Sequence, residues 1–92
     1  TKVIDIVRKL TSYHVRIDVY DPWVNPAECL EEYGIATITS PQPGDYDGIV
    51  VCVAHRQFAE MGVESIRAYG KANHVLFDVK GMFPKASVDA RL

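Results

Sequence analysis

The sequence predicts an α/β fold, a three-layer α/β/α Rossmann-like domain built around a mostly parallel sheet of about four strands. Segments with apolar residues at helical spacing alternate along the chain with short segments of β type. Residues 48–54 form an unbroken apolar run, which is typical of a parallel strand covered on both faces. Glycines and prolines separate these segments, as expected at the turns between elements.

The composition indicates one soluble globular domain covering residues 1–92. Hydrophobic residues make up 48% of the chain, charged residues make up 24%, and the formal net charge is −2. This charge predicts no general attraction to nucleic acid or to an anionic membrane. No apolar run is long enough to cross a bilayer. The domain is small for an autonomous enzyme, and because it opens with Thr1 rather than Met we expect a fragment of a longer protein.

The first helix is expected at residues 2–10. Its apolar residues recur at intervals of three and four, which is the pattern of an amphipathic helix. After a turn at residues 11–14, residues 15–20 alternate strictly between apolar and polar side chains and predict a strand with one covered face.

The second helix has the clearest start and stop signals. Asn25 can cap it, Pro26 suits the first helical position, Glu28 stands where a capping box places an acid, and Gly34 ends it. A short strand at residues 35–38 is expected next.

The rest of the chain continues the alternation. The segment at residues 40–45 predicts a loop, too short to link two domains. After the long apolar run, short helices are expected at residues 58–62 and 63–69. The strand that contains Phe77 follows, and a short helix is expected in the tail at residues 82–92.

The cysteines and histidines indicate neither a reactive thiol nor a metal site. Cys29 falls in a helix pattern and Cys52 in the apolar run, so both are predicted to be core thiols in a reducing cytoplasm. Neither has the basic, partly exposed setting of a catalytic thiol. The three histidines, His14, His55 and His74, are scattered, and no Cys/His spacing matches a metal site.

The best candidate for chemistry is Lys80. It follows Asp78 at the carboxyl end of an apolar strand and stands beside Gly81. In a parallel α/β sheet, ligands collect at the carboxyl ends of the strands, and a lysine there suits a phosphate or another anion. A plain polar turn leaving the strand explains the same residues, and spacing alone leaves both interpretations open.

Other polar residues near strand ends have equally simple explanations. Asp21 could accept a hydrogen bond from a sugar hydroxyl or form a turn with Pro22. His55 could act as an acid or base, or serve as a loop residue or a contact to a neighbouring domain. Trp23 could fill the edge of the core or cover an interdomain face. No Gly-x-Gly-x-x-Gly and no Gly-Lys-Ser/Thr occurs, so the chain holds no dinucleotide pyrophosphate in the usual glycine-turn manner.

Five short blocks, in order and at familiar spacings, carry a more specific signal. They are Val3-Ile4-Asp5-Ile6-Val7, Val19-Tyr20-Asp21-Pro22-Trp23-Val24, Tyr46-Asp47-Gly48-Ile49-Val50, Ala54-His55-x-x-Phe58 and Phe77-Asp78-Val79-Lys80-Gly81. Together they resemble the C-terminal, UDP-binding domain of the UDP-glucose/GDP-mannose dehydrogenase family over essentially the whole chain. The tail at residues 83–92 is most similar to the branch that oxidises UDP-N-acetylhexosamines for bacterial surface polysaccharides such as capsule, O-antigen and Vi antigen.

The resemblance implies an enzyme of which this chain is one part. In that family an N-terminal Rossmann domain binds NAD and a central helical domain dimerises. The sugar C6 alcohol is oxidised twice, to the acid, using two NAD, and a cysteine nucleophile in the central part forms a thiohemiacetal and then a thioester. That cysteine's motif and the NAD fingerprint are absent here, so the isolated chain is expected to be inactive. The family places Arg or Lys after Phe-Asp-x, near the substrate diphosphate and the active site, and here that residue is Lys80. Asp78, Tyr20 and His55 are expected at cleft-facing strand ends, without a specific role.

Two hypotheses of different classes follow. The first is the UDP-sugar-binding part of a cytoplasmic, NAD-dependent UDP-sugar 6-dehydrogenase, whose partners are the substrate and the other domains of the same chain, in a homodimer or larger assembly. The second is a non-catalytic α/β ligand-binding or interaction module that reuses the fold. The upstream part of the parent protein separates them, because only the enzyme requires a glycine-rich fingerprint and a Gly-Gly-x-Cys-type segment there.

Overall fold

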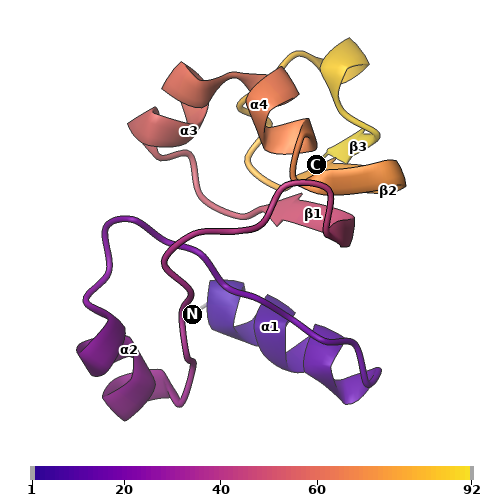
Figure 1. The fold of residues 1–92 in the computed structure, drawn as a ribbon. Helices are drawn as coiled ribbons and strands as arrows, with labels where there is room; N and C mark the ends of the chain where they lie inside the picture. Colours follow the sequence, from indigo (N-terminus) through magenta and orange to yellow (C-terminus); the bar gives the residue numbers. More distant parts are fainter. Residues whose placement is uncertain (1, 92) are drawn as a thin grey trace. The chain divides into compact units, whose positions relative to one another are not determined.

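The computed structural model describes residues 2–91. The chain divides into two compact units, Thr1–Pro41 and Gln42–Leu92 (Figure 1). The boundary falls in the predicted proline- and glycine-containing loop at residues 40–45. None of the helices described in residues 2–91 is long and apolar enough to cross a membrane.

The first unit contains helices α1 (Lys2–Ser12) and α2 (Pro26–Tyr33). The amphipathic pattern predicted for the first helix is confirmed, because Ile6 and Leu10 are partly buried whereas Arg8 and Lys9 are exposed. The helix continues two residues beyond the predicted end at residue 10, through Thr11 and Ser12, whose hydroxyls donate hydrogen bonds to backbone carbonyls of the preceding turn.

Helix α2 forms as its capping residues predict. The side-chain oxygen of Asn25 accepts the backbone N–H groups of Ala27 and Glu28, at 3.0 and 3.2 Å. Gly34 ends the helix in the left-handed conformation with φ 70°, and its N–H donates to the carbonyl of Leu30.

The two strands expected in the first unit are reduced to one isolated bridge. Val19 pairs with Thr37 in parallel orientation, and the N–H of Ile38 donates to the carbonyl of Val19 at 2.8 Å. The prediction of regular strands at residues 15–20 and 35–38 was therefore wrong in extent. Alternation of apolar and polar side chains indicates which face of an extended segment each side chain lies on, but a strand also needs a continuous ladder of backbone hydrogen bonds.

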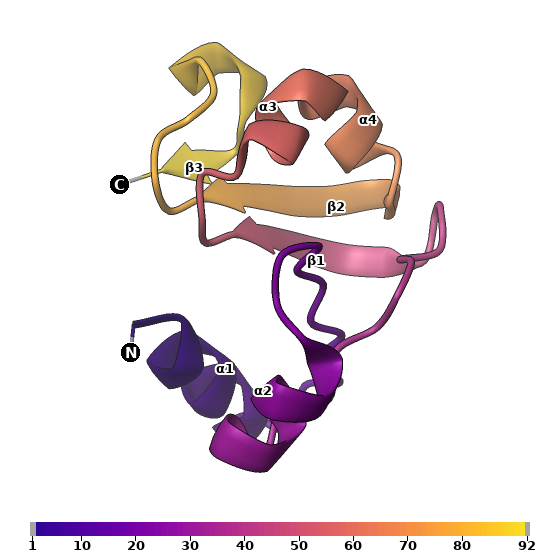
Figure 2. The same ribbon diagram turned by 90° about the vertical axis from the view of Figure 1, so that its left-hand side faces the viewer.

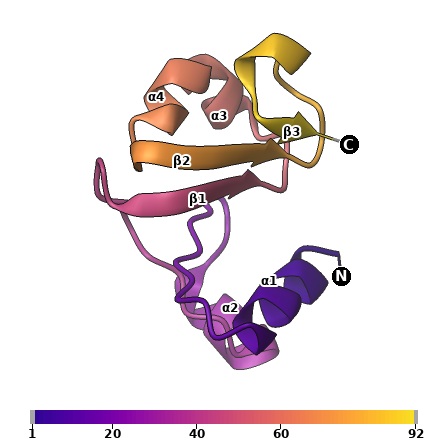
Figure 3. The same cartoon turned by 90° about the vertical axis from the view of Figure 1, so that its right-hand side faces the viewer.

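The second unit is a parallel sheet with helices on one side. Strands β1 (Tyr46–Val51), β2 (Gly70–Asp78) and β3 (Ala90–Arg91) are arranged in the order β1-β2-β3, and both neighbouring pairs are parallel. Helices α3 (Arg56–Met61) and α4 (Val63–Arg67) connect β1 to β2, and the short 3-10 helix η1 (Lys85–Ser87) precedes β3. Figures 2 and 3 show the three arrows pointing the same way, with α3, α4 and η1 together on one side of the sheet.

The α/β class with a parallel sheet is thus confirmed, and its details differ from the prediction in three ways. The sheet has three strands instead of about four, and its central strand is β2. Strand β1 lies at an edge and ends at Val51, so Cys52 to Ala54 leave the sheet. The tail, where a short helix was expected, forms η1 and then β3, because Ala90 and Arg91 pair with Phe77 and Asp78.

The core of the second unit lies between the sheet and its helices. It consists of Val51, Ile66, Leu76, Phe83 and Val88. Leu76, in the middle of β2, is fully buried. Phe83 and Val88 come from the segment between β2 and β3, so this segment is anchored in the core at both of its ends.

Candidate functional site

Lys80 lies where the three strands of the second unit end together. Strand β2 finishes at Asp78, and the N–H of Val79 still donates to the carbonyl of Val51 at 3.0 Å, which carries the β1–β2 pairing one residue further. The chain then bends, and Lys80 is exposed. Because all three strands are parallel, their carboxyl ends form one edge of the sheet, where ligands of α/β proteins bind.

Gly81 allows this bend to lie directly against an arginine. Its φ is 66°, in the left-handed region that glycine adopts without steric strain. A Cβ built on Gly81 would lie 3.4 Å from Nη2 of Arg91 and 3.5 Å from its Cζ, which is ordinary van der Waals contact. The backbone beside Lys80 therefore packs on the guanidinium of Arg91, the last residue of β3.

Asp78 is placed beneath the same loop and does not face solvent. It is the one fully buried charged side chain in the described residues, and its Oδ2 accepts the N–H of Phe83 at 2.9 Å. Its Oδ1 has no hydrogen-bond partner among residues 2–91. Phe83 is also bound through its carbonyl, which accepts a hydrogen bond from Nη1 of Arg91 at 3.1 Å. The loop that carries Lys80 is thus held by a carboxylate on one backbone group of Phe83 and by a guanidinium on the other.

His55 occupies the start of α3. It is the N-cap residue of that helix, and its side chain makes no capping hydrogen bond. Its carbonyl accepts the N–H groups of Phe58 and Ala59, and its ring lies 5.5 Å from the ring of Phe58. This local contact explains the spacing of His55 and Phe58 in the sequence.

Two further candidates belong to the first unit. Tyr20 is partly buried, one residue after the bridge at Val19. The side chain of Asp21 accepts the N–H of Trp23 at 2.8 Å, which confirms the turn interpretation of Asp21. The side chain of Trp23 is 60% exposed.

The prediction that both thiols lie in the core was wrong in extent, because neither is fully buried. Cys29 and Cys52 are both free and partly buried, and Cys29 lies in α2. Burial raises the pKa of the Cys52 thiol, which opposes formation of a nucleophilic thiolate. Among residues 2–91, no three His, Cys, Asp or Glu side chains gather in a way that could hold a metal ion.

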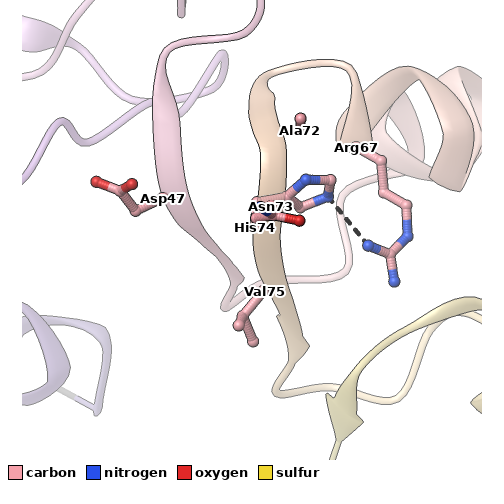
Figure 4. Close-up of a pocket in the computed structure, with 6 residues that line it drawn as sticks. All are labelled: Asp47, Arg67, Ala72, Asn73, His74 and Val75. Carbon is pink, nitrogen blue, oxygen red and sulfur yellow. Dashed lines mark hydrogen bonds between the residues drawn. The ribbon is translucent and has the colours of Figure 1, made fainter.

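A shallow hollow of about 380 Å³ lies elsewhere, toward the amino-terminal half of β2 (Figure 4). It is lined by Asp47, Arg67, Ala72, Asn73, His74 and Val75. It contains none of the candidate residues at the carboxyl edge, so this hollow and the predicted anion site are different places.

The arginine of this hollow is already occupied by internal contacts. Nη1 of Arg67 lies 3.0 Å from Nε2 of His74 and 3.2 Å from a carboxylate oxygen of Asp89. Because arginine can only donate, Nε2 of His74 accepts, and Nδ1 carries the proton that is donated to the carbonyl of Lys71 at 2.7 Å. The ring of His74 fills the space where a Cβ of residue 70 would stand, so Gly70 is required there. This network stabilises the fold, and the positive charge of Arg67 is paired with Asp89 rather than available to a ligand.

Sequence reasoning predicted Lys80 at this edge of the sheet and did not predict that Arg91 lies there as well. A two-residue strand is too short for a clear pattern, but Val88 to Arg91 alternates between apolar and polar side chains. That alternation is the signal that could have predicted a strand ending at Arg91, next to the end of β2.

Comparison with known proteins defines the class to which the fold and the site belong. Residues 1–85 match the family model described as the UDP-glucose/GDP-mannose dehydrogenase family, UDP binding domain. The chain therefore belongs to this family and corresponds to its UDP binding domain, as the five sequence blocks predicted.

Two curated relatives make the placement more precise. The UDP-N-acetyl-D-glucosamine 6-dehydrogenase of Pseudomonas aeruginosa is 49% identical to this chain, and the enzyme of the same name from Salmonella typhi is 44% identical. Both alignments cover all 92 residues of this chain and 22% of the relative, so the chain spans about a fifth of the length of these proteins. No solved structure gives a significant match.

Proposed function

We propose that this chain is the C-terminal, nucleotide-sugar-binding domain of an NAD-dependent UDP-sugar 6-dehydrogenase. The observation that carries the proposal is the exposed Lys80, which stands beside Gly81 at the shared carboxyl edge of three parallel strands in a chain of a UDP-binding family. In this proposal residues 1–92 act as one domain. The family match supports this, because it runs across the boundary between the two units.

Lys80 binds the diphosphate of the substrate. An ammonium group at a strand end, facing a doubly charged diphosphate, forms charge-assisted hydrogen bonds that are shorter and stronger than neutral ones. Because lysine is a point charge, it supplies attraction but little control of orientation. The buried carboxylate of Asp78 contributes by holding the loop through Phe83 rather than by touching the substrate. That Tyr20 and His55 lie near the substrate stays a prediction.

The chemistry belongs to parts of the enzyme outside this chain. Two NAD molecules would each accept one hydride in the oxidation of the C6 alcohol to a carboxylate, and the glycine-rich NAD-binding loop belongs to the N-terminal domain. The cysteine nucleophile belongs to the central part. The free thiols of this chain do not replace it, since burial raises the pKa of Cys52 and Cys29 lies within a helix.

The names of the relatives favour UDP-N-acetyl-D-glucosamine as the substrate. UDP-N-acetylgalactosamine and UDP-glucose are the two other candidates. The acid product would serve the synthesis of a bacterial surface polysaccharide such as a capsule or the Vi antigen. The parent enzyme is proposed to act in the cytoplasm as a homodimer or a larger assembly.

The test is an assay of the full-length parent protein with NAD and a panel of UDP-sugars. We expect two NADH per UDP-N-acetylhexosamine oxidised, and no turnover by the isolated 92-residue chain. A parent sequence that lacks both the glycine-rich fingerprint and the Gly-Gly-x-Cys-type segment would instead support the non-catalytic binding module.

Lys80→Ala in the full-length protein tests the role of this residue. Hydrogen bonds to charged groups contribute about 1.5–3 kcal/mol, so the Kd for UDP should rise roughly 10- to 100-fold. Lys71→Ala is the matched control, because it removes the same charge from the opposite end of β2, where the side chain of Lys71 forms an exposed ion pair with Asp47 at 3.2 Å. Calorimetric titration with UDP measures both variants, and equal affinities for the two would refute the role of Lys80.

A further inference from the structure

We propose that Arg91 is a second cation of the diphosphate site and that its guanidinium binds the same diphosphate as Lys80. The inference rests on the proposed function, since it assumes that UDP binds at the carboxyl edge of the sheet. It assigns to the tail of the chain a direct contact with the ligand.

The sheet places Arg91 at this edge. Strand β3 is parallel to β2, and Arg91 pairs with Asp78, the last residue of β2. Neighbouring strands lie about 4.8 Å apart, and paired residues of parallel strands point to the same face. The side chain of Arg91 therefore starts beside the point where the chain leaves β2, and its guanidinium reaches the loop that carries Lys80.

The guanidinium is held in a defined position. Its Nη2, Cζ and Nε lie along Gly81, at 3.4 to 3.6 Å from a Cβ built there, and Nη1 donates to the carbonyl of Phe83 at 3.1 Å. Phe83 is itself fixed, because it is buried in the core and its N–H is bound by Asp78. A cation whose position is fixed before binding loses less conformational freedom when it binds a ligand.

Most of the donors of Arg91 remain available. The guanidinium has five N–H groups, and the carbonyl of Phe83 is the only acceptor recorded for it within residues 2–91. Arg91 is exposed, so these donors are accessible to a ligand. Arg67 differs in this respect, because it is bound to His74, Asp89 and the carbonyl of Ser87.

The charges around the loop favour an anion. Lys80 precedes Gly81 in the chain, Arg91 packs on Gly81, and Lys85 follows at the start of η1; all three cations are exposed. The carboxylate at this point is Asp78, which is fully buried and faces the backbone of Phe83. Asp89 lies close in sequence but binds the N–H of Leu76 and the guanidinium of Arg67.

The two cations have complementary geometry. Lys80 provides a compact charge on a flexible stem, whereas a guanidinium offers a planar fork that matches two phosphoryl oxygens at once. A diphosphate has two phosphoryl groups, so one can meet the ammonium while the other meets the fork. Arg91 thereby supplies the orientation that Lys80 alone does not.

The test uses the full-length enzyme with UDP and with uridine, which lacks the phosphates. Arg91→Gln removes the charge and leaves a shorter, polar side chain. We expect the Kd for UDP to rise about tenfold or more, with the inhibition constant of uridine unchanged. Arg91→Lys keeps the charge without the fork and should fall between Arg91→Gln and the wild type. Lys71→Ala is the charge control and should match the wild type.

The possible results separate this inference from the proposed function. If the wild type does not bind UDP, the proposed function itself fails. If Lys80→Ala weakens UDP binding and Arg91→Gln leaves it unchanged at an unaltered Tm, only the role of Arg91 is refuted. An equal loss of UDP and uridine affinity in Arg91→Gln would mean that Arg91 holds the loop without binding the phosphates, which also overturns the inference.

Discussion

Gly81 links a backbone conformation to the proposed ligand site at the scale of one residue. Its φ of 66° favours glycine, and a Cβ built there would be in van der Waals contact with the guanidinium of Arg91. Gly44 has nearly the same φ, 69°, but a Cβ there would meet nothing within 4 Å. The two glycines therefore share one conformational constraint and differ in their surroundings.

Gly81→Ala and Gly44→Ala should each lower the free energy of unfolding by about 1–2 kcal/mol, because alanine is strained in the left-handed region. Only Gly81→Ala should also weaken UDP binding, since its methyl group would cover the face of the guanidinium of Arg91. Urea denaturation measures the first quantity and calorimetric titration of the full-length enzyme the second. An unchanged UDP affinity in Gly81→Ala would show that this face of Arg91 is not used.

Asp89 predicts a pH dependence of stability. The hydrogen bond from the N–H of Leu76, and next the one from Arg67, lower the pKa of the Asp89 carboxyl below its ordinary value of 3.8. A carboxyl whose pKa is lowered by folding stabilises the folded state fully above the ordinary pKa, and this stabilisation disappears as the pH falls through the lower, folded value.

The comparison with Asp89→Asn isolates this effect. The difference in free energy of unfolding between the wild type and the variant should stay constant above about pH 5 and should shrink as the pH falls below the ordinary pKa. Chemical denaturation at a series of pH values measures it. A difference that does not change with pH would mean that the contacts of Asp89 do not depend on its charge.

At the scale of elements, α2 was predictable because its signals are local. Asn25, Pro26 and Gly34 each act within one turn of the helix, so neighbouring residues in the sequence are enough to recognise them. Asn25→Ala should lower the free energy of unfolding by about 1 kcal/mol, whereas Asn25→Ser, which retains a capping oxygen, should lower it much less. Thermal or urea denaturation of the three proteins tests this, and equal losses in both variants would show that the cap contributes no stability.

The strands were less predictable because pairing is not local. Residues 15–20 have the alternation of a strand but form a single bridge, whereas the two residues of β3 have almost no pattern and pair fully with β2. Which segments pair depends on which other segments the rest of the fold places beside them. The sequence therefore indicated which segments are extended, but it did not indicate which of them join the sheet.

Two neighbouring residues of β2 test which face of the sheet packs on the core. Leu76 is fully buried, and its neighbour Val75 is 56% exposed on the other face. Leu76→Ala should lower the free energy of unfolding by about 2–5 kcal/mol, because it opens a cavity in the core. Val75→Ala should lower it by less than about 1 kcal/mol, since little buried area is lost there. Similar losses for both variants would contradict the assignment of the core face of β2.

At the scale of the whole molecule, the chain forms two compact units that the family match treats as one domain. The class was evident from the sequence, because the order of helices, extended segments and short blocks spans the chain and does not depend on any single contact. The same order of blocks led to the family, and the family match confirmed it.

The sequence by itself determined the α/β class, the capped helix α2, the family, and Lys80 as the residue at the end of a strand. These features depend on local backbone preferences and on the order of motifs, and both can be recognised in the sequence alone. Only the tertiary structure decided that Asp78 is buried beneath the loop and that β3 ends beside β2, with Arg91 on Gly81. The physical reason is that strand pairing joins segments that are separate in the sequence, such as those of Asp78 and Arg91, and no pattern within either segment specifies its partner.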